Sequence, residues 1–272
     1  MSAVNRRSFV VFAAGSAVGA SVAAVSPSLS ANAMSERSKE PAVSDVPKSV
    51  VDRYGLNTNW YGKYIDAWGV PVLGSRKLED ATLLRARAQL GTLLWTYPWW
   101  PVPELIRRKV RVVIAARGEL MSCIPEINSR FGTDLDVRYW GGMGATDSLP
   151  LSVGTEANLM DNTNDENVFV HEFGHTLMDM ALAHIDTKFS PELQSAWDAA
   201  MAAGRWSNTY AGSSIKEYWA EGTQSYFDVN RVGLAGGDGI HNDIGTRAKL
   251  KEYDSPLFTL LDRVFCGASL KS

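Results

Sequence analysis

Residues 167–181 read NVFVHEFGHTLMDMA, and they hold two of the chain's four histidines. An α-helix turns by about 100° per residue, so side chains four positions apart project from the same face. His171 and His175 therefore come together if this segment is helical. The preceding polar stretch DNTNDEN offers residues that can cap a helix start, and no proline interrupts the run to His184. We expect one helix over Glu166–His184 that presents both imidazoles on a single face.

Two imidazoles on one helix face can bind a single metal ion. Catalytic zinc prefers such nitrogen ligands together with a carboxylate, and it leaves a fourth position to water. Glu172 flanks the pair, close enough to touch that water without binding the ion. Zinc would lower the pKa of the water towards neutrality, and Glu172 would accept its proton as general base. The alternative is a pair of core histidines bonded to the backbone, with Glu172 in a salt bridge.

The third metal ligand does not follow from this motif. One group of metal sites has a further histidine six residues after the second, but Ala181 stands at that position here. His184 follows His175 by nine residues and is expected at the helix end or on the surface. His241, in the sequence GDGIHND, is expected in a loop and is a weaker ligand candidate.

Two glutamates offer a better third ligand. Glu217 and Glu221 are four residues apart in a stretch expected to be helical, so both can face the metal helix. One would bind zinc, and the other would orient a histidine from behind. Ser214 and Glu217 also fit a capping box, which would tie the Glu217 side chain to its own helix start. From the residues alone, the choice between the two glutamates stays open.

The motif HEFGH at 171–175, with Tyr210 and the motif EYWAE at 217–221, resembles the catalytic domain of the anthrax toxin lethal factor family. That family belongs to the zincins whose third ligand is glutamate. The resemblance implies that Glu217 binds zinc and that Glu221 supports a histidine. It also implies that the Tyr210 hydroxyl donates to the oxyanion that forms on the substrate, although Tyr210 read alone could be an ordinary aromatic near a helix start.

The resemblance is strong over residues 167–228 and weaker on either side of that range. The weaker likeness is to secreted, mostly uncharacterised relatives, and it lies in VVIAARGELMSCIPE before the motifs and in HNDIGTRAKLKEYDSPLF after them. The targeting and substrate-docking domains of the lethal factor have no counterpart here. The resemblance therefore implies a zinc peptidase acting on peptide bonds, and it carries no claim about the substrate.

The first 33 residues have the order of an export signal. Arg6 and Arg7 are their only charges; Phe9 opens an Ala/Gly/Val run to about Val25, and Ala31-Asn32-Ala33 follows. This order is typical of a twin-arginine signal cleaved after Ala33, so we expect a secreted or periplasmic protein. The alternative is an uncleaved anchor, but the run is short and interrupted by Gly and Ser. No stable membrane span is expected after cleavage.

The remaining chain is expected to be one domain, over residues 51–272, preceded by a flexible, polar lead-in at 34–50. Its fold class is expected to be α+β and zincin-like, with a small mixed sheet followed by a helical half that carries the motif helix. Expected strands are Tyr64–Leu73, Val110–Ala116, Asp136–Trp140 and Leu149–Val153. Besides the motif helix, expected helices are Glu79–Leu94, a short one near Cys123–Arg130, Ser190–Ala203, Ser214–Arg231 and Ser255–Phe265.

Charge and aromatic content bear on the partners. Without the first 33 residues, which contribute Arg6 and Arg7 but no acidic residue, the chain has 25 basic and 30 acidic residues. There is no Lys/Arg cluster, so nucleic acid is not an expected partner. A peptide or protein is the expected substrate, and Leu149–Val153 could pair with it as an edge strand. The cluster Trp95–Trp100 is expected to cap the core.

Two other classes of function compete with the peptidase. A pseudo-peptidase would keep the zinc and work as a binding or inhibitory module, but the general base at Glu172 argues against it. A carbohydrate-binding protein would use the clustered tryptophans and leave the HEFGH motif unexplained. Cys123 and Cys266 are the only cysteines, and we expect two buried thiols rather than a disulfide.

Overall fold

The computed structural model describes residues 41–94, 101–136, 141–162 and 165–270, within one compact unit that starts at Pro41. The expected export signal, the cluster Trp95–Trp100 and residues 137–140 lie outside the described residues. Residues 41–50, expected as a flexible lead-in, belong to the compact unit. The backbone of Ser44 pairs with Tyr64 at 2.9 Å in both directions, and Val43 and Val46 pack on the core.

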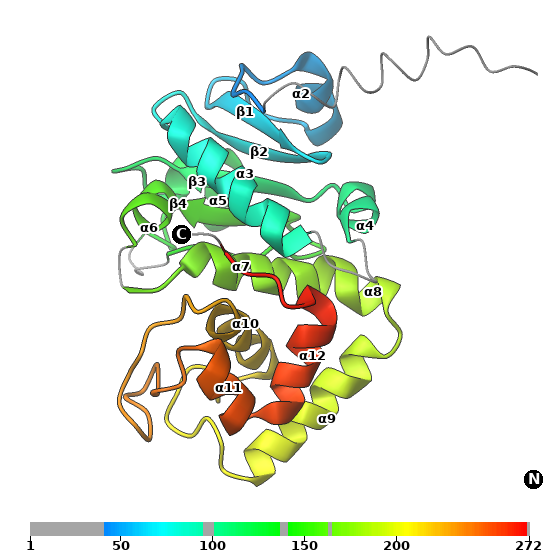
Figure 1. Cartoon of the computed structure of the whole chain (residues 1–272). Coiled ribbons are helices and arrows are strands. Elements are labelled where there is room, and N and C mark those ends of the chain that lie inside the picture. Colours follow the sequence, from blue (N-terminus) through cyan, green and yellow to red (C-terminus); the bar gives the residue numbers. More distant parts are fainter. Residues whose placement is uncertain (1–40, 95–100, 137–140, 163–164, 271–272) are drawn as a thin grey trace, which may run out of the picture. The chain divides into compact units, whose positions relative to one another are not determined.

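The expected α+β class with a small mixed sheet is confirmed (Figure 1). The strands are β1 (Tyr61–Ala67), β2 (Val70–Ser75), β3 (Arg111–Ala115) and β4 (Leu151–Thr155). The helices of the first half are α2 (Lys48–Tyr54), α3 (Asp80–Leu94), α4 (Val102–Arg107), η1 (Met121–Cys123), α5 (Pro125–Phe131) and α6 (Glu156–Asp161). Those of the second half are α7 (Val168–Leu177), η3 (Met178–Leu182), α8 (Ala183–Ile185), α9 (Phe189–Ala202), α10 (Ile215–Tyr226), α11 (Arg247–Tyr253) and α12 (Ser255–Phe265).

The sheet has the strand order β1-β2-β3-β4, antiparallel between the first two strands and parallel between the others. The expectation of a single strand over Tyr64–Leu73 is wrong, because this stretch turns back on itself as a hairpin. Trp68 and Gly69 form its two-residue turn with φ of 56° and 96°. Two successive positive φ angles match the twist of antiparallel strands, and glycine adopts them without strain.

Alternating side chains of the strands supply two cores, as the period of two in a strand requires. Val72, Val112 and Ile114 face the main core, which the sheet shares with α3, α7, α10 and α12. Leu73, Val113 and Val153 face the opposite side, where α2 and α5 cover the sheet. Both faces of the sheet are therefore buried.

Helix α7 lies between the sheet and the helices of the second half (Figure 1). The fully buried Trp219 of α10 donates its indole N–H to the carbonyl of Gly174 in α7 at 2.9 Å. On the other side of α7, Phe169 packs beneath β4 against Gly154. This packing fixes α7 relative to both β4 and α10, the two elements nearest the motif histidines.

The expectation of buried cysteines is wrong, because Cys123 and Cys266 are both exposed. Each lies at the end of an element, Cys123 in the last position of η1 and Cys266 just after α12, where side chains meet solvent. Within the described ranges, no helix has the length and apolar character needed to cross a membrane.

Candidate metal centre

The motif helix forms as the sequence predicts. The Asn167 side chain caps its start by accepting a hydrogen bond from the Val170 N–H at 3.1 Å. The helical run passes from α7 through the π-helical turn η3 and ends at Ile185, within about two residues of the expected bounds. Such π turns often occur at functional sites. His171 and His175 leave the same face, and His171 is only 7% exposed.

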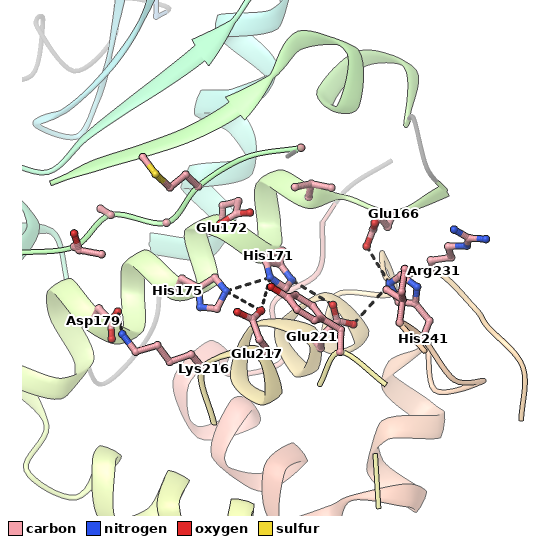
Figure 2. A pocket seen from close by; sticks show the side chains of 18 residues that line it. Glu166, His171, Glu172, His175, Asp179, Lys216, Glu217, Glu221, Arg231 and His241 are labelled. Carbon is pink, nitrogen blue, oxygen red and sulfur yellow. Dashed lines mark hydrogen bonds and ion pairs between the residues drawn. The ribbon is translucent and has the colours of Figure 1, made fainter. Parts of the chain in front are cut away.

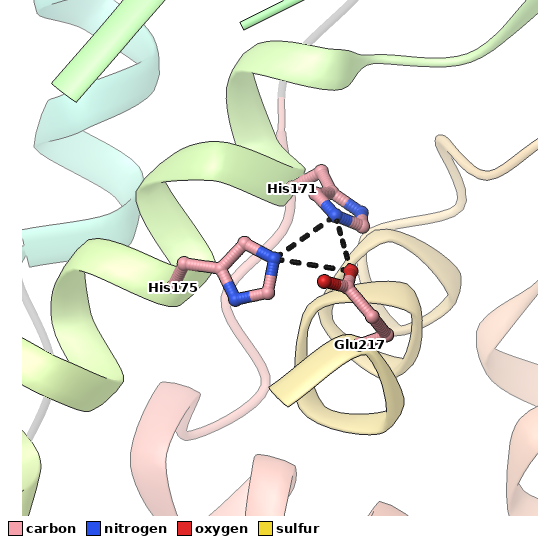
Figure 3. A group of neighbouring side chains, drawn as sticks. All are labelled: His171, His175 and Glu217. Atoms are coloured by element: carbon pink, nitrogen blue, oxygen red, sulfur yellow. Dashed lines mark hydrogen bonds and ion pairs between the residues drawn. The ribbon is translucent and has the colours of Figure 1, made fainter. Parts of the chain in front are cut away.

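Helix α10 brings Glu217 to these histidines. Ser214 caps α10, since its hydroxyl accepts from the Glu217 N–H at 3.3 Å. The Glu217 carboxylate points away from this cap, and its Oε2 lies 3.1 Å from His171 Nε2 and 3.2 Å from His175 Nε2. The cap involves only the backbone N–H of Glu217. Its carboxylate therefore remains available to contact the two imidazoles (Figure 3).

The three atoms form a nearly equilateral triangle, since the two Nε2 atoms are also 3.1 Å apart. Ligands bound to zinc at about 2.0–2.2 Å in tetrahedral geometry are separated by about 3.3 Å. The donor set and its spacing therefore fit zinc. Of the alternatives raised by the sequence, a pair of backbone-bonded core histidines does not describe this arrangement, because both Nε2 atoms point at Glu217 and at each other.

Glu172 and Tyr210 line the same cavity as the triangle. Glu172 is partly exposed to the cavity, and the surrounding protein raises the pKa of its carboxyl by desolvation. The Tyr210 ring lies nearly parallel to the imidazole of His171, with centroids 6.2 Å apart. Burial and the negative charge of Glu217 raise the pKa of the phenol, so Tyr210 keeps its proton at neutral pH. The expected base and the expected oxyanion donor thus stand at the cavity beside the expected ligands.

The charges of the triangle are strongly coupled. Burial alone would lower the pKa of His171, but the hydrogen bond to Glu217 and the carboxylates around it raise that pKa to about 10. Burial alone would raise the pKa of Glu217, but the hydrogen bonds from the two imidazoles lower it. The metal-free site therefore holds a proton on His171, and a bound metal would replace that proton.

The coupling predicts how the stability of the metal-free protein depends on pH. A histidine whose folded pKa is about 10, against an ordinary pKa of 6.5, stabilises the fold fully below pH 6.5. This stabilisation is lost as pH rises towards 10. We expect the free energy of unfolding of metal-free protein to fall by about 2–4 kcal/mol from pH 7 to pH 10. Urea unfolding across this range, with zinc-loaded protein beside it, measures the effect; a flat profile in the metal-free protein would contradict it.

A glycine-rich segment forms a wall of the cavity and packs against α7 beside Glu172 and His175. The backbone of Met143 pairs with Val153 of β4 at 3.0 and 2.7 Å, so it covers β4 there and becomes the outer edge. A Cβ on Gly142 would lie 2.5 Å from Glu172 Cγ, and one on Gly144 would lie 2.6 Å from His175 Cβ. The expectation that Leu149–Val153 offers the edge for a peptide is therefore wrong about its position. Residues 141–146 cover β4 at Val153 and line the cavity.

This close approach predicts a strong effect of a side chain at Gly144. Gly144→Val should displace His175 and weaken zinc binding by about tenfold or more, because interiors are close-packed and cannot absorb the branched side chain. Zinc affinity by competition with a chromophoric chelator measures this. The matched control is Gly118→Asn, since Gly118 has φ of 77° and nothing within 4 Å of an added Cβ. Equal zinc affinity in the Gly144 variant and the wild type would contradict the close contact.

The cavity has a volume of about 640 Å³, in the range of ligand-binding pockets. Figure 2 shows the metal-ligand candidates at its centre and charged residues at both ends. At one end Asp179 of η3 pairs with Lys216 at 2.6 Å. At the other end lie Glu166, Arg231 and His241. A peptide bound in extended form along residues 141–146 would therefore run from one charged end of the cavity to the other.

The remaining histidines differ in their surroundings. His184 is exposed and its Nε2 lies 3.1 Å from the Asp179 carbonyl, so it is a helix-end histidine as expected. His241 lies in a loop, as expected, but it is only 4% exposed and its Nε2 lies 3.2 Å from Glu166 Oε2. It stays outside the triangle.

A residue that the sequence did not point to, Gln224, lies at the outer nitrogen of His171. Gln224 Oε1 lies 2.9 Å from His171 Nδ1, nearer than Glu221 Oε1 at 3.5 Å. Glu221 thus faces the histidine as expected, but it shares that nitrogen with Gln224. The signal was present in the spacing, because positions 217, 221 and 224 fall on one face of a helix.

Comparisons of the chain with protein-family models, curated proteins and solved structures found no match.

Proposed function

We propose that this protein is a zinc-dependent peptidase that hydrolyses peptide bonds, with His171, His175 and Glu217 as the metal ligands. The observation that carries the proposal is the triangle of 3.1–3.2 Å between their ligand atoms, at a cavity that Glu172 and Tyr210 also line. The resemblance to the lethal factor family supports it, since that resemblance implies the same ligands. The zincin-like fold and a secreted or periplasmic location are parts of the same proposal.

Zinc, when bound, would acidify a water molecule and polarise the scissile carbonyl. Glu172 would accept the proton of the attacking water, and the pKa of its carboxyl, raised by desolvation, suits a base that later passes the proton on to the leaving amine. The protonated Tyr210 hydroxyl would donate to the oxyanion. Residues 141–146 would bind the peptide as an added strand.

Cleavage of a mixed peptide library and of an unfolded protein, followed by mass spectrometry, tests the proposal. The purified protein should cut peptides when zinc-loaded, lose this activity after chelation, and regain it when zinc returns. Binding of one zinc per chain without cleavage of either substrate would contradict the peptidase and leave a zinc-containing binding module in its place. The Trp95–Trp100 cluster plays no part in this test.

A further inference from the structure

A ring of polar side chains lies behind the metal-ligand candidates, on the side of His171 that faces away from the triangle. Its members come from three separate segments: Glu166 precedes α7, Glu221 and Gln224 belong to α10, and His241 lies in the loop before α11. Figure 2 shows Glu166, Glu221 and His241. Gln224 is fully buried, and Glu221 and His241 are 3% and 4% exposed. Buried polar groups of this kind are costly unless they are hydrogen-bonded to one another.

The donor and the acceptor of the hydrogen bonds within the ring can be assigned. His171 Nδ1 lies 2.9 Å from Gln224 Oε1, and Gln224 Nε2 donates to Glu166 Oε2 at 3.2 Å. His241 Nε2 lies 3.2 Å from the same Glu166 oxygen and 3.9 Å from Glu221 Oε2. Among the described residues, His241 Nδ1 has no hydrogen-bond partner, so the proton of this imidazole belongs on Nε2, between the two carboxylates.

This arrangement fixes the amide of Gln224. If the amide were turned over, its NH₂ group would face the His171 ring and its carbonyl would face the Glu166 carboxylate. The second contact would place two acceptors against each other, because an ionised carboxylate only accepts hydrogen bonds. The contact with Glu166 therefore holds the Gln224 amide with its carbonyl oxygen facing His171 Nδ1. Because a carbonyl oxygen only accepts hydrogen bonds, His171 must carry a proton on Nδ1. The proton that a metal replaces is then the one on Nε2, beside Glu217, and its loss leaves the Nε2 lone pair for the metal.

The same three groups could be thought to hold a second metal, since atoms of Glu166, Glu221 and His241 lie within 4.8 Å of one another. The oxygens concerned already accept hydrogen bonds, however. Gln224 Nε2 donates to Glu166 Oε2, and Asn230 Nδ2 donates to Glu221 Oε2 at 2.9 Å. A metal would have to displace both amides, so the contacts favour a hydrogen-bonded ring.

We propose that Glu166 and His241 are positioning residues that act through Gln224 and Glu221 to hold His171 in the tautomer that binds zinc. The inference rests on the proposed metal site, and it adds to that site two residues that lie outside both motifs. Groups that orient a metal-binding histidine from behind typically change metal affinity by about 10–100-fold when they are removed. Neither residue need touch the substrate for this effect.

Zinc affinity of the purified full chain, measured by chelator competition, tests the inference. We expect His241→Leu and Glu166→Leu each to weaken zinc binding by about 10–100-fold. His241→Gln keeps a side-chain N–H and should stay within about threefold of the wild type. His184→Leu is the matched control, since His184 is exposed and outside the ring, and its affinity should be unchanged. Wild-type affinity in both leucine variants would overturn the inference, as would equal losses in His241→Leu and His241→Gln.

A second measurement separates positioning from a loss of fold. The ¹⁵N chemical shifts of the metal-free His171 ring, recorded above its pKa so that the ring is neutral, should report the Nδ1–H form in the wild type and a mixture of tautomers in Glu166→Leu. Glu166 is partly exposed, so this variant carries the test even where His241→Leu does not fold. A pure Nδ1–H form in Glu166→Leu would overturn the inference, and so would a second zinc per chain that is lost with His241. A wild type that binds no zinc would instead overturn the proposed function.

Discussion

Replacing Glu172 with glutamine should reduce peptide hydrolysis by about 10²–10⁴-fold while zinc binding stays intact. Glutamine has nearly the same shape but cannot accept the proton of the attacking water. Glu172 supplies none of the three ligand atoms, so the substitution should leave the metal in place. Initial rates on a peptide that the wild type cleaves, measured with matched zinc content, give the ratio directly.

The matched control for this variant is Glu252→Gln, because Glu252 is an exposed residue of α11. It carries the same chemical change outside the cavity and should keep the wild-type rate. If Glu172→Gln also kept that rate, Glu172 would not be the base. Loss of zinc from the Glu172 variant would place that residue among the ligands and contradict its assigned role.

Removing the Glu217 carboxylate should weaken zinc binding more than any change behind the histidines. Glu217→Ala takes away one of the three ligand atoms, so we expect a loss of more than about 100-fold. Glu221→Ala should cost about 10–100-fold, because Glu221 meets His171 only at Nδ1, at 3.5 Å. Chelator competition on both variants decides between the two glutamates.

Both glutamates lie on α10, four residues apart, so each variant serves as the matched control of the other. Unfolding of the metal-free variants by urea should show whether the helix itself is weakened. A larger loss of zinc affinity in Glu221→Ala than in Glu217→Ala would contradict the ligand assignment.

The sequence was most informative where a helical period and a chemical motif coincide. The spacing of His171 and His175 predicted α7, and the spacing of Glu217 and Glu221 predicted that both face it. The choice between the two glutamates could not be read from the residues, because the capping pattern at Ser214 offered the Glu217 side chain a competing partner at its own helix start. Only the packing of α10 on α7 places Glu217 beside both imidazoles.

Other parts of the centre depend on contacts between distant segments. His241 and Glu166 are separated by 75 residues, and no local period links them. The approach of Gly144 to His175 likewise depends on how residues 141–146 pair with β4. The turn at Trp68 was missed because a tryptophan with positive φ is uncommon, so a continuous apolar stretch suggested one strand instead of two.

The position of the metal tests the central claim most directly. Diffraction from crystals of the zinc-loaded protein, collected at the zinc absorption edge, locates the ion through its anomalous signal. We expect one peak, about 2.0–2.2 Å from His171 Nε2, His175 Nε2 and a Glu217 oxygen. A peak among Glu166, Glu221 and His241 instead, or no peak at the two motif histidines, would contradict it.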